Sequence, residues 1–145
     1  MARRMKLPRV LGHEVSGVVE SIGADVDNVA VGDHVSLESH IFCGQCRPCI
    51  MGKAHLCMAT TYPGIDINGA FAEYLTVPSS IAWVNPPGLA HETAAMLEPF
   101  GIAVHASLEG SGVVGQTVLV NGCGPIGLMN IAAARAFGAK TVIAS

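Results

Sequence analysis

Four cysteines within fifteen residues constrain the fold of this chain more than any other sequence feature. They follow the pattern C-x2-C-x2-C-x7-C and are Cys43, Cys46, Cys49 and Cys57. Zinc prefers four ligands in a tetrahedron, and four thiolates leave no coordination position open for a substrate. Glycine and proline between the cysteines exclude a long helix. The pattern therefore predicts a structural zinc site that folds a lobe with too little core to fold alone.

Two other chemistries of the cysteine lobe stay open. The cysteines could remain free or pair as disulfides, and closely spaced cysteines also ligate iron–sulfur clusters. Disulfides are disfavoured because the N-terminal segment has no apolar signal region. A nucleic-acid-binding zinc finger is disfavoured because few basic residues surround the lobe.

The composition excludes several classes of protein. Charged residues make up 13% of the 145 residues, and apolar residues 50%. Since soluble domains carry about 25% charged residues, the chain is too apolar to be disordered. A net charge of −3 disfavours general nucleic-acid binding. We interpret the apolar excess as the mark of a fragment whose surfaces are covered by further segments of a larger protein.

The most apolar stretch, residues 113–144, is interrupted by polar and charged residues. It does not reach the roughly 20 apolar residues of a membrane-spanning helix. We expect a cytoplasmic protein without a membrane partner.

Periodicity and turn residues predict a change of architecture along the chain. The first part is β-rich, with extended segments expected at residues 11–22, 34–38, 71–77 and 81–84. The last part is α/β, with helices expected at residues 91–97, 100–108 and 126–137 and strands at 117–120 and 141–144. The final strand–helix–strand series implies a parallel sheet. A domain boundary is expected near residues 86–98.

A glycine-rich turn follows the apolar strand 117–120 and opens the next helix. It has the spacing Gly122-x-Gly124-x-x-Gly127. In dinucleotide-binding folds the first glycine permits the tight turn, the second lets the backbone approach a pyrophosphate, and the third allows close packing of helix and strand. A purely structural turn is the alternative. The acidic residue that binds the ribose would lie about 20 residues further on, just after Ser145, so the sequence leaves NAD or NADP open.

His13, Glu14 and Glu98 are weak signals on their own. A lone histidine is usually a hydrogen-bonded structural residue. In a strand that starts at residue 11, neighbouring His13 and Glu14 would point to opposite faces. The pattern alone therefore predicts no second metal site.

Several segments resemble the zinc-dependent medium-chain dehydrogenase family. GHEVSGVVESIGADVDNVAVGDHV is similar to the signature of its catalytic domain, and the cysteine lobe and VLVNGCGPIGL follow in the same order. SLESHIFCGQC, GIDINGAFAEYLTVP and LEPFGIAVHA are similar to the branch of L-threonine 3-dehydrogenases. The resemblance implies a partial β-rich GroES-like catalytic domain over residues 1–97. It implies the start of an α/β Rossmann domain over residues 98–145.

The same resemblance implies the site residues. His13 would bind a catalytic zinc, with Glu14 beside it as a ligand or near-ligand. Glu98 would lie close to that zinc and act in proton relay, and His40 would influence substrate handling. The four cysteines would hold a structural zinc. The phosphates and nearby ribose of NAD or NADP would contact Gly122, Gly124, Pro125, Ile126 and Gly127.

The chain departs from the family in one respect. The first catalytic-zinc ligand of the family is a cysteine well upstream of the GHE segment, whereas the twelve residues before His13 contain none. We expect that the segment carrying this ligand is missing and that the fragment alone is inactive.

For the full-length enzyme, the resemblance implies hydride transfer from a secondary alcohol, L-threonine first, to NAD or NADP. A polyol or diol dehydrogenase acting on sorbitol or butanediol is the nearest alternative. A non-catalytic module built on the structural zinc is the alternative of another class. The partners would be a small-molecule alcohol or amino acid and, in the full-length protein, further copies of itself.

Metal analysis of the purified 145-residue chain tests these expectations. We expect at most one tightly held zinc per chain, because only the four thiolates form a complete tetrahedral set. Two tightly held zinc ions together with dinucleotide binding would contradict the expectation of an incomplete catalytic site.

Overall fold

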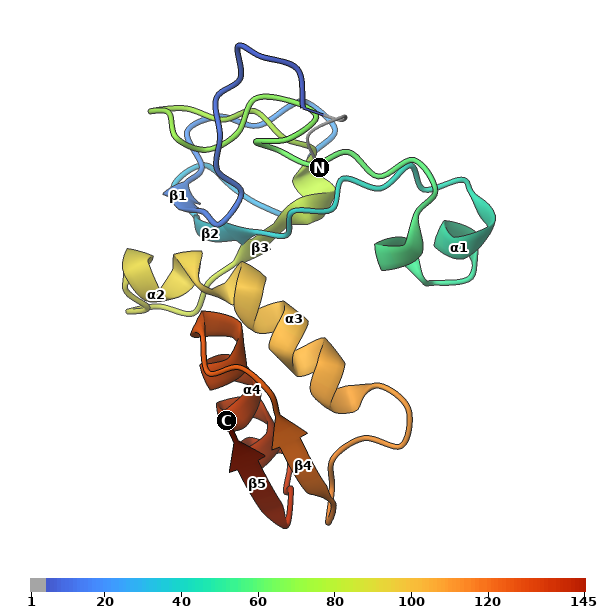
Figure 1. Cartoon of the computed structure of the whole chain (residues 1–145). Coiled ribbons are helices and arrows are strands. Elements are labelled where there is room, and N and C mark those ends of the chain that lie inside the picture. Colours follow the sequence, from blue (N-terminus) through green and yellow to red (C-terminus); the bar gives the residue numbers. More distant parts are fainter. Residues whose placement is uncertain (1–4) are drawn as a thin grey trace. The chain divides into compact units, whose positions relative to one another are not determined.

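The computed structural model describes residues 5–145 (Figure 1). The chain forms two compact units, the first ending at Glu98 and the second comprising Pro99–Ser145. Within residues 5–145, no helix combines the length and apolar character needed to cross a bilayer.

A three-stranded antiparallel sheet forms the centre of the first unit. Its strands are β1 (Ser16–Val18), β2 (His34–Leu37) and β3 (Ala82–Val84), in the order β1-β2-β3. A 3-10 turn, η2 (Ser79–Ile81), leads into β3, and its Ile81 side chain is buried.

The short helix α2 (His91–Ala95) packs against β1 and β2. The contact is polar as well as apolar. The hydroxyl of Ser36 lies 2.8 Å from the carbonyl of Ala94 and 3.0 Å from the side-chain oxygen of Asn85, and all three residues are buried. These hydrogen bonds join the sheet to the segment that follows it.

The cysteine lobe projects from the sheet as an irregular loop (Figure 1). It contains only α1 (Arg47–Ile50) and the 3-10 turn η1 (Ala54–Leu56), which agrees with the exclusion of a long helix. An antiparallel bridge between Ile41 and Thr61 closes its base. The lobe has no buried side chain of its own, so its fold requires another source of stability.

The second unit contains the predicted strand–helix–strand series. Strands β4 (Thr117–Val120) and β5 (Thr141–Ala144) pair in parallel, and α4 (Pro125–Ala136) connects them. Helix α3 (Leu97–Leu108) begins at the last residues of the first unit. Pro99 lies in its first turn, where the missing N–H would have no helical partner, so the helix continues through it.

Two extended segments differ from the sequence prediction. Residues 11–22 form only the three-residue strand β1, and residues 71–77 form no strand. The N–H of Ala70 donates to Gly12 and that of Phe71 to Leu11. In the described part of the chain, no strand lies beside the rest of this segment to pair with it, and pairing is what makes an extended segment a strand.

Three glycines, Gly12, Gly64 and Gly69, bring distant backbone segments together. A Cβ on Gly69 would lie 2.6 Å from the Cα of Gly64 and would also collide with the carbonyl of Gly12. Gly12 and Gly64 have φ values of +97° and +76°, which favour glycine. We call this contact the glycine junction.

Gly69→Ala is expected to lower the free energy of unfolding by at least about 1–3 kcal/mol, because backbone atoms cannot yield as a flexible side chain can. Urea unfolding measures the change. Gly17→Ala is the matched control, since a Cβ there meets nothing within 4 Å. Equal stability of the two variants would show that the junction does not need glycine.

Candidate functional site

The four lobe cysteines converge as a metal site requires. Their Sγ atoms all lie within 4.8 Å of one another, and each residue is partly buried. The Sγ of Cys46 lies 3.5 Å from that of Cys49 and 3.9 Å from that of Cys57. A disulfide would need about 2.05 Å, whereas Zn–S bonds of about 2.3 Å place two sulfurs of a tetrahedron about 3.8 Å apart. The donor set therefore fits zinc.

Backbone N–H groups lower the pKa of two of these thiols, those of Cys46 and Cys57. The N–H groups of Cys43 and Ala59 point at the Sγ of Cys57 from 3.3 and 3.4 Å. Chiefly through the hydrogen bond from Cys43, they lower the pKa of Cys57 to about 6. Burial raises the pKa of Cys49, and the neighbouring thiols add to this effect. Metal binding needs deprotonated cysteines, and the donor hydrogen bonds at Cys57 favour that form.

A second cluster joins His13, Glu14 and Glu98. One ligand atom from each residue lies within 4.8 Å of the others. The sequence pattern alone did not predict this cluster, because neighbouring residues of a regular strand face opposite sides unless the strand begins irregularly. The resemblance had grouped the three residues at one zinc. Strand β1 begins only at Ser16, so His13 and Glu14 lie in irregular backbone directly after Gly12. Strand alternation therefore does not separate them.

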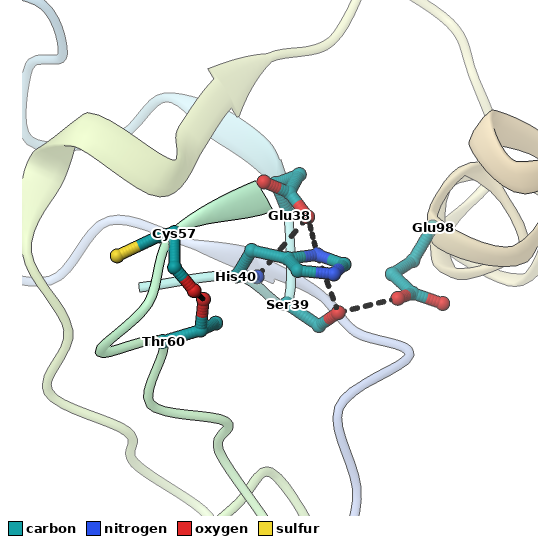
Figure 2. Close-up of polar contacts among 6 residues, drawn as sticks. All are labelled: Glu38, Ser39, His40, Cys57, Thr60 and Glu98. Carbon is teal, nitrogen blue, oxygen red and sulfur yellow. Dashed lines mark hydrogen bonds and ion pairs between the residues drawn. The ribbon is translucent and has the colours of Figure 1, made fainter. Parts of the chain in front are cut away.

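Glu98 is also the end of a polar network (Figure 2). The hydroxyl of Ser39, which is 2% exposed, lies 2.5 Å from the Oε1 of Glu98 and 3.5 Å from the Nδ1 of His40. The same Nδ1 forms a short contact with the Oε1 of Glu38. Because the side chain of Glu38 is 44% exposed, the network runs from the second cluster to solvent.

Sequence reasoning selected His40 and Glu98 but missed Ser39 and Glu38. The available signal was their position beside His40 in one Glu-Ser-His run at the end of β2. The ring of Tyr62 meets the ring of His40 edge-on, with the ring centroids 4.9 Å apart. Tyr62 follows the bridge residue Thr61, and this contact limits the orientations open to the imidazole.

The glycine-rich turn borders a hollow of about 390 Å³ in the second unit. Gly122 has a φ of +99°, and Gly124 is the N-cap of α4. A Cβ on Gly127 would collide with the carbonyl of Gly122. The third glycine therefore lets the helix pack close to the turn, as in dinucleotide-binding folds.

The start of α4 fits a phosphate group. Its first helical hydrogen bond runs from the N–H of Leu128 to the carbonyl of Gly124. The N–H groups of Ile126 and Gly127 precede that bond and can therefore serve an anion. Pro125 lacks an N–H, but at the first position of a helix this group would have no helical partner.

Comparison with known proteins finds a matching domain family and several similar proteins. Residues 1–88 match the model of the alcohol dehydrogenase GroES-like domain. The chain is 51% identical over 142 residues to L-threonine 3-dehydrogenase of Bacillus subtilis (strain 168), a match that covers 98% of this chain and 41% of that protein. The chain thus spans about two fifths of the length of this curated relative.

Two solved structures are similar over nearly the whole chain. Galactitol-1-phosphate dehydrogenase from Escherichia coli is 34% identical with a TM-score of 0.91, over 96% of this chain and 40% of that one. A protein from Sinorhizobium meliloti 1021, described as a zinc-binding dehydrogenase and bound to NADP, is 35% identical with a TM-score of 0.86. That match covers 97% of this chain and 41% of the other.

Removing the metal tests the origin of the lobe's stability. We expect a zinc chelator to abolish amide-hydrogen-exchange protection of the lobe amides that donate hydrogen bonds, such as those of Leu56 and Cys57, because the lobe has no core of its own. The sheet amides of β2 should keep their protection. Cys123→Ser, outside the lobe, is the control and should behave as wild type. Unchanged protection after complete removal of the metal would refute a structural zinc.

Proposed function

The chain belongs to the alcohol dehydrogenase family with a GroES-like domain, and from this premise we propose that it is part of a zinc-dependent dehydrogenase. The proposed reaction moves a hydride from a secondary alcohol to NAD or NADP. The observation that carries the proposal is the convergence of His13, Glu14 and Glu98, beside a network that reaches solvent.

We assign residues 1–97 to a partial catalytic domain and residues 98–145 to the start of a Rossmann domain. The compact units that divide at Glu98 and Pro99 support this assignment. The parallel pairing of β4 and β5 around α4 supports the second part of it.

The catalytic metal would be held by His13 and Glu14, with Glu98 beside it. When bound, zinc acts as a Lewis acid that lowers the pKa of an alcohol hydroxyl, and the nicotinamide accepts the hydride. An imidazole nitrogen and carboxylate oxygens are ordinary zinc donors, so the cluster fits this metal. The lobe cysteines would hold a separate, structural zinc.

Glu98 would receive the proton that leaves the substrate hydroxyl. Ser39 donates its hydroxyl proton to the Oε1 of Glu98, which leaves Oε2 as the oxygen able to accept another proton. For a proton to leave Glu98 by this route, the Ser39 hydroxyl would accept it and give its own proton to the Nδ1 of His40. That nitrogen would pass its proton to Glu38, whose carboxylate reaches solvent. His40 would also influence substrate handling.

The glycine-rich turn would hold the dinucleotide. The N–H groups of Ile126 and Gly127 would bind the pyrophosphate, while Gly122 and Gly124 allow its close approach. Pro125 fixes the first turn of α4. Either NAD or NADP is compatible with these contacts.

L-Threonine is the proposed substrate because the Bacillus relative is named for it and shares 51% of its aligned residues. A polyol is the second candidate because galactitol-1-phosphate dehydrogenase has a similar structure. We also propose that the full-length protein is a cytoplasmic homo-oligomer. Zinc–thiolate ligation suits a reducing compartment, and the large exposed apolar side chains of both units leave surface for further contacts.

Substrate oxidation by the full-length protein that contains this chain tests the proposal. Formation of reduced cofactor would be followed with L-threonine, sorbitol, butanediol and galactitol 1-phosphate, each with NAD and NADP. We expect the highest kcat/KM with L-threonine, and Glu98→Gln should lower kcat about 10²–10⁴-fold because a proton acceptor is lost.

Glu92→Gln is the matched control, since Glu92 is an exposed glutamate on α2. Turnover of a polyol without turnover of L-threonine would select the second candidate. Failure to oxidise any alcohol, with the lobe zinc in place, would favour a non-catalytic zinc module.

A further inference from the structure

Two histidines and a serine form a cluster that neither proposed metal site uses. The Oγ of Ser16, on β1, lies 2.6 Å from the Nε2 of His34 on β2. The same oxygen lies 2.9 Å from the Nδ1 of His91, the first residue of α2. The two imidazole rings are 4.2 Å apart at their centroids and tilted by 57°. Two ring nitrogens from distant parts of the chain thus converge on one oxygen.

Proton counting shows that one hydroxyl can bond both rings only if the two imidazoles are in different tautomeric roles. The hydroxyl has one proton, so it can donate to only one of the two rings, and the other ring must be in the tautomer that donates back. Among the described residues, neither ring makes another hydrogen bond to protein. Only this shared contact therefore sets the tautomers of the two rings. If the hydroxyl turns away, the Nε2 of His34 and the Nδ1 of His91 can each present a lone pair.

The geometry points to a binding site for a divalent transition-metal ion, and we propose that His34 and His91 are its two protein nitrogen ligands. Neutral imidazole suits Zn²⁺, Ni²⁺ and Cu²⁺. The Oγ of Ser16 occupies the point on which both nitrogens converge, so the hydroxyl would turn aside to admit an ion. Each imidazole nitrogen would then bind that ion at about 2.0–2.1 Å.

Exposure of the cluster determines what kind of site it is. His34 and Ser16 are partly buried, whereas His91 is exposed. Water can therefore complete the coordination, and a substrate or further ligand could replace that water. Because the donors come from β1, β2 and α2, a bound ion would cross-link the sheet to the helix that packs on it.

The site is independent of the proposed dehydrogenase function. None of its residues belongs to the cysteine lobe or to the cluster of His13, Glu14 and Glu98. It would bind metal whether or not the chain takes part in alcohol oxidation.

Titration of the 145-residue chain with Ni²⁺ tests the proposal, after the lobe has been filled with one equivalent of zinc. High-spin Ni²⁺ is paramagnetic, so it broadens the NMR signals of the rings that bind it. We expect the ring signals of His34 and His91 to broaden together, and the melting temperature to rise because the ion binds only the folded chain.

His91→Gln should weaken Ni²⁺ binding at least tenfold, equivalent to about 1.4 kcal/mol, and leave the ring signal of His34 sharp. Amide spectra check that this variant folds. His105→Gln is the matched control and should keep the wild-type response at His34 and His91, because His105 lies on α3, outside all the proposed metal sites. Ser16→Ala should also retain Ni²⁺ binding, since both imidazoles remain.

Three results would overturn the proposal. The first is that the His34 and His91 signals of the wild-type chain stay sharp in excess Ni²⁺. The second is that His91→Gln binds as wild type. The third is that folded Ser16→Ala loses binding, which would make the hydroxyl rather than the two imidazoles the main donor.

Discussion

The contact among Gly12, Gly64 and Gly69 is the constraint on which the rest of the first unit depends. It holds the chain that leaves the cysteine lobe against the segment that leads into β1, with backbone atoms closer than any side chain would permit. The residues directly after Gly12 are His13 and Glu14, so the same contact fixes the start of the second cluster. A glycine requirement directly beside His13 thereby controls where potential ligands lie.

The segment that follows β2 connects the cysteine lobe with the cluster of His13, Glu14 and Glu98. Ser39 holds Glu98 through a hydrogen bond, and His40 packs on Tyr62 at the base of the lobe. Directly after His40, the bridge between Ile41 and Thr61 closes the lobe that carries the four thiols. A metal that orders the lobe would therefore also stabilise the backbone that supports Glu98.

Local features were predictable because they depend on short stretches of sequence. The cysteine spacing indicated the lobe, and the glycine spacing together with Pro125 indicated the turn into α4. The prediction failed where pairing partners decide the structure. Residues 71–77 have strand composition but no neighbouring strand among residues 5–145. Strand pairing of β1 begins only at Ser16, so the backbone of His13 and Glu14 is irregular and their side chains can lie together.

The sequence by itself determined the donor types, their spacing in the lobe and the conformational freedom of the glycine turn, since these are properties of residues close together in the chain. The tertiary structure alone decided that Glu98 meets His13 and Glu14, that Ser39 connects it to His40, and that His34 and His91 share one serine oxygen. The physical reason is that such contacts join residues up to 85 positions apart. Their geometry follows from strand register and helix packing, which no local pattern encodes.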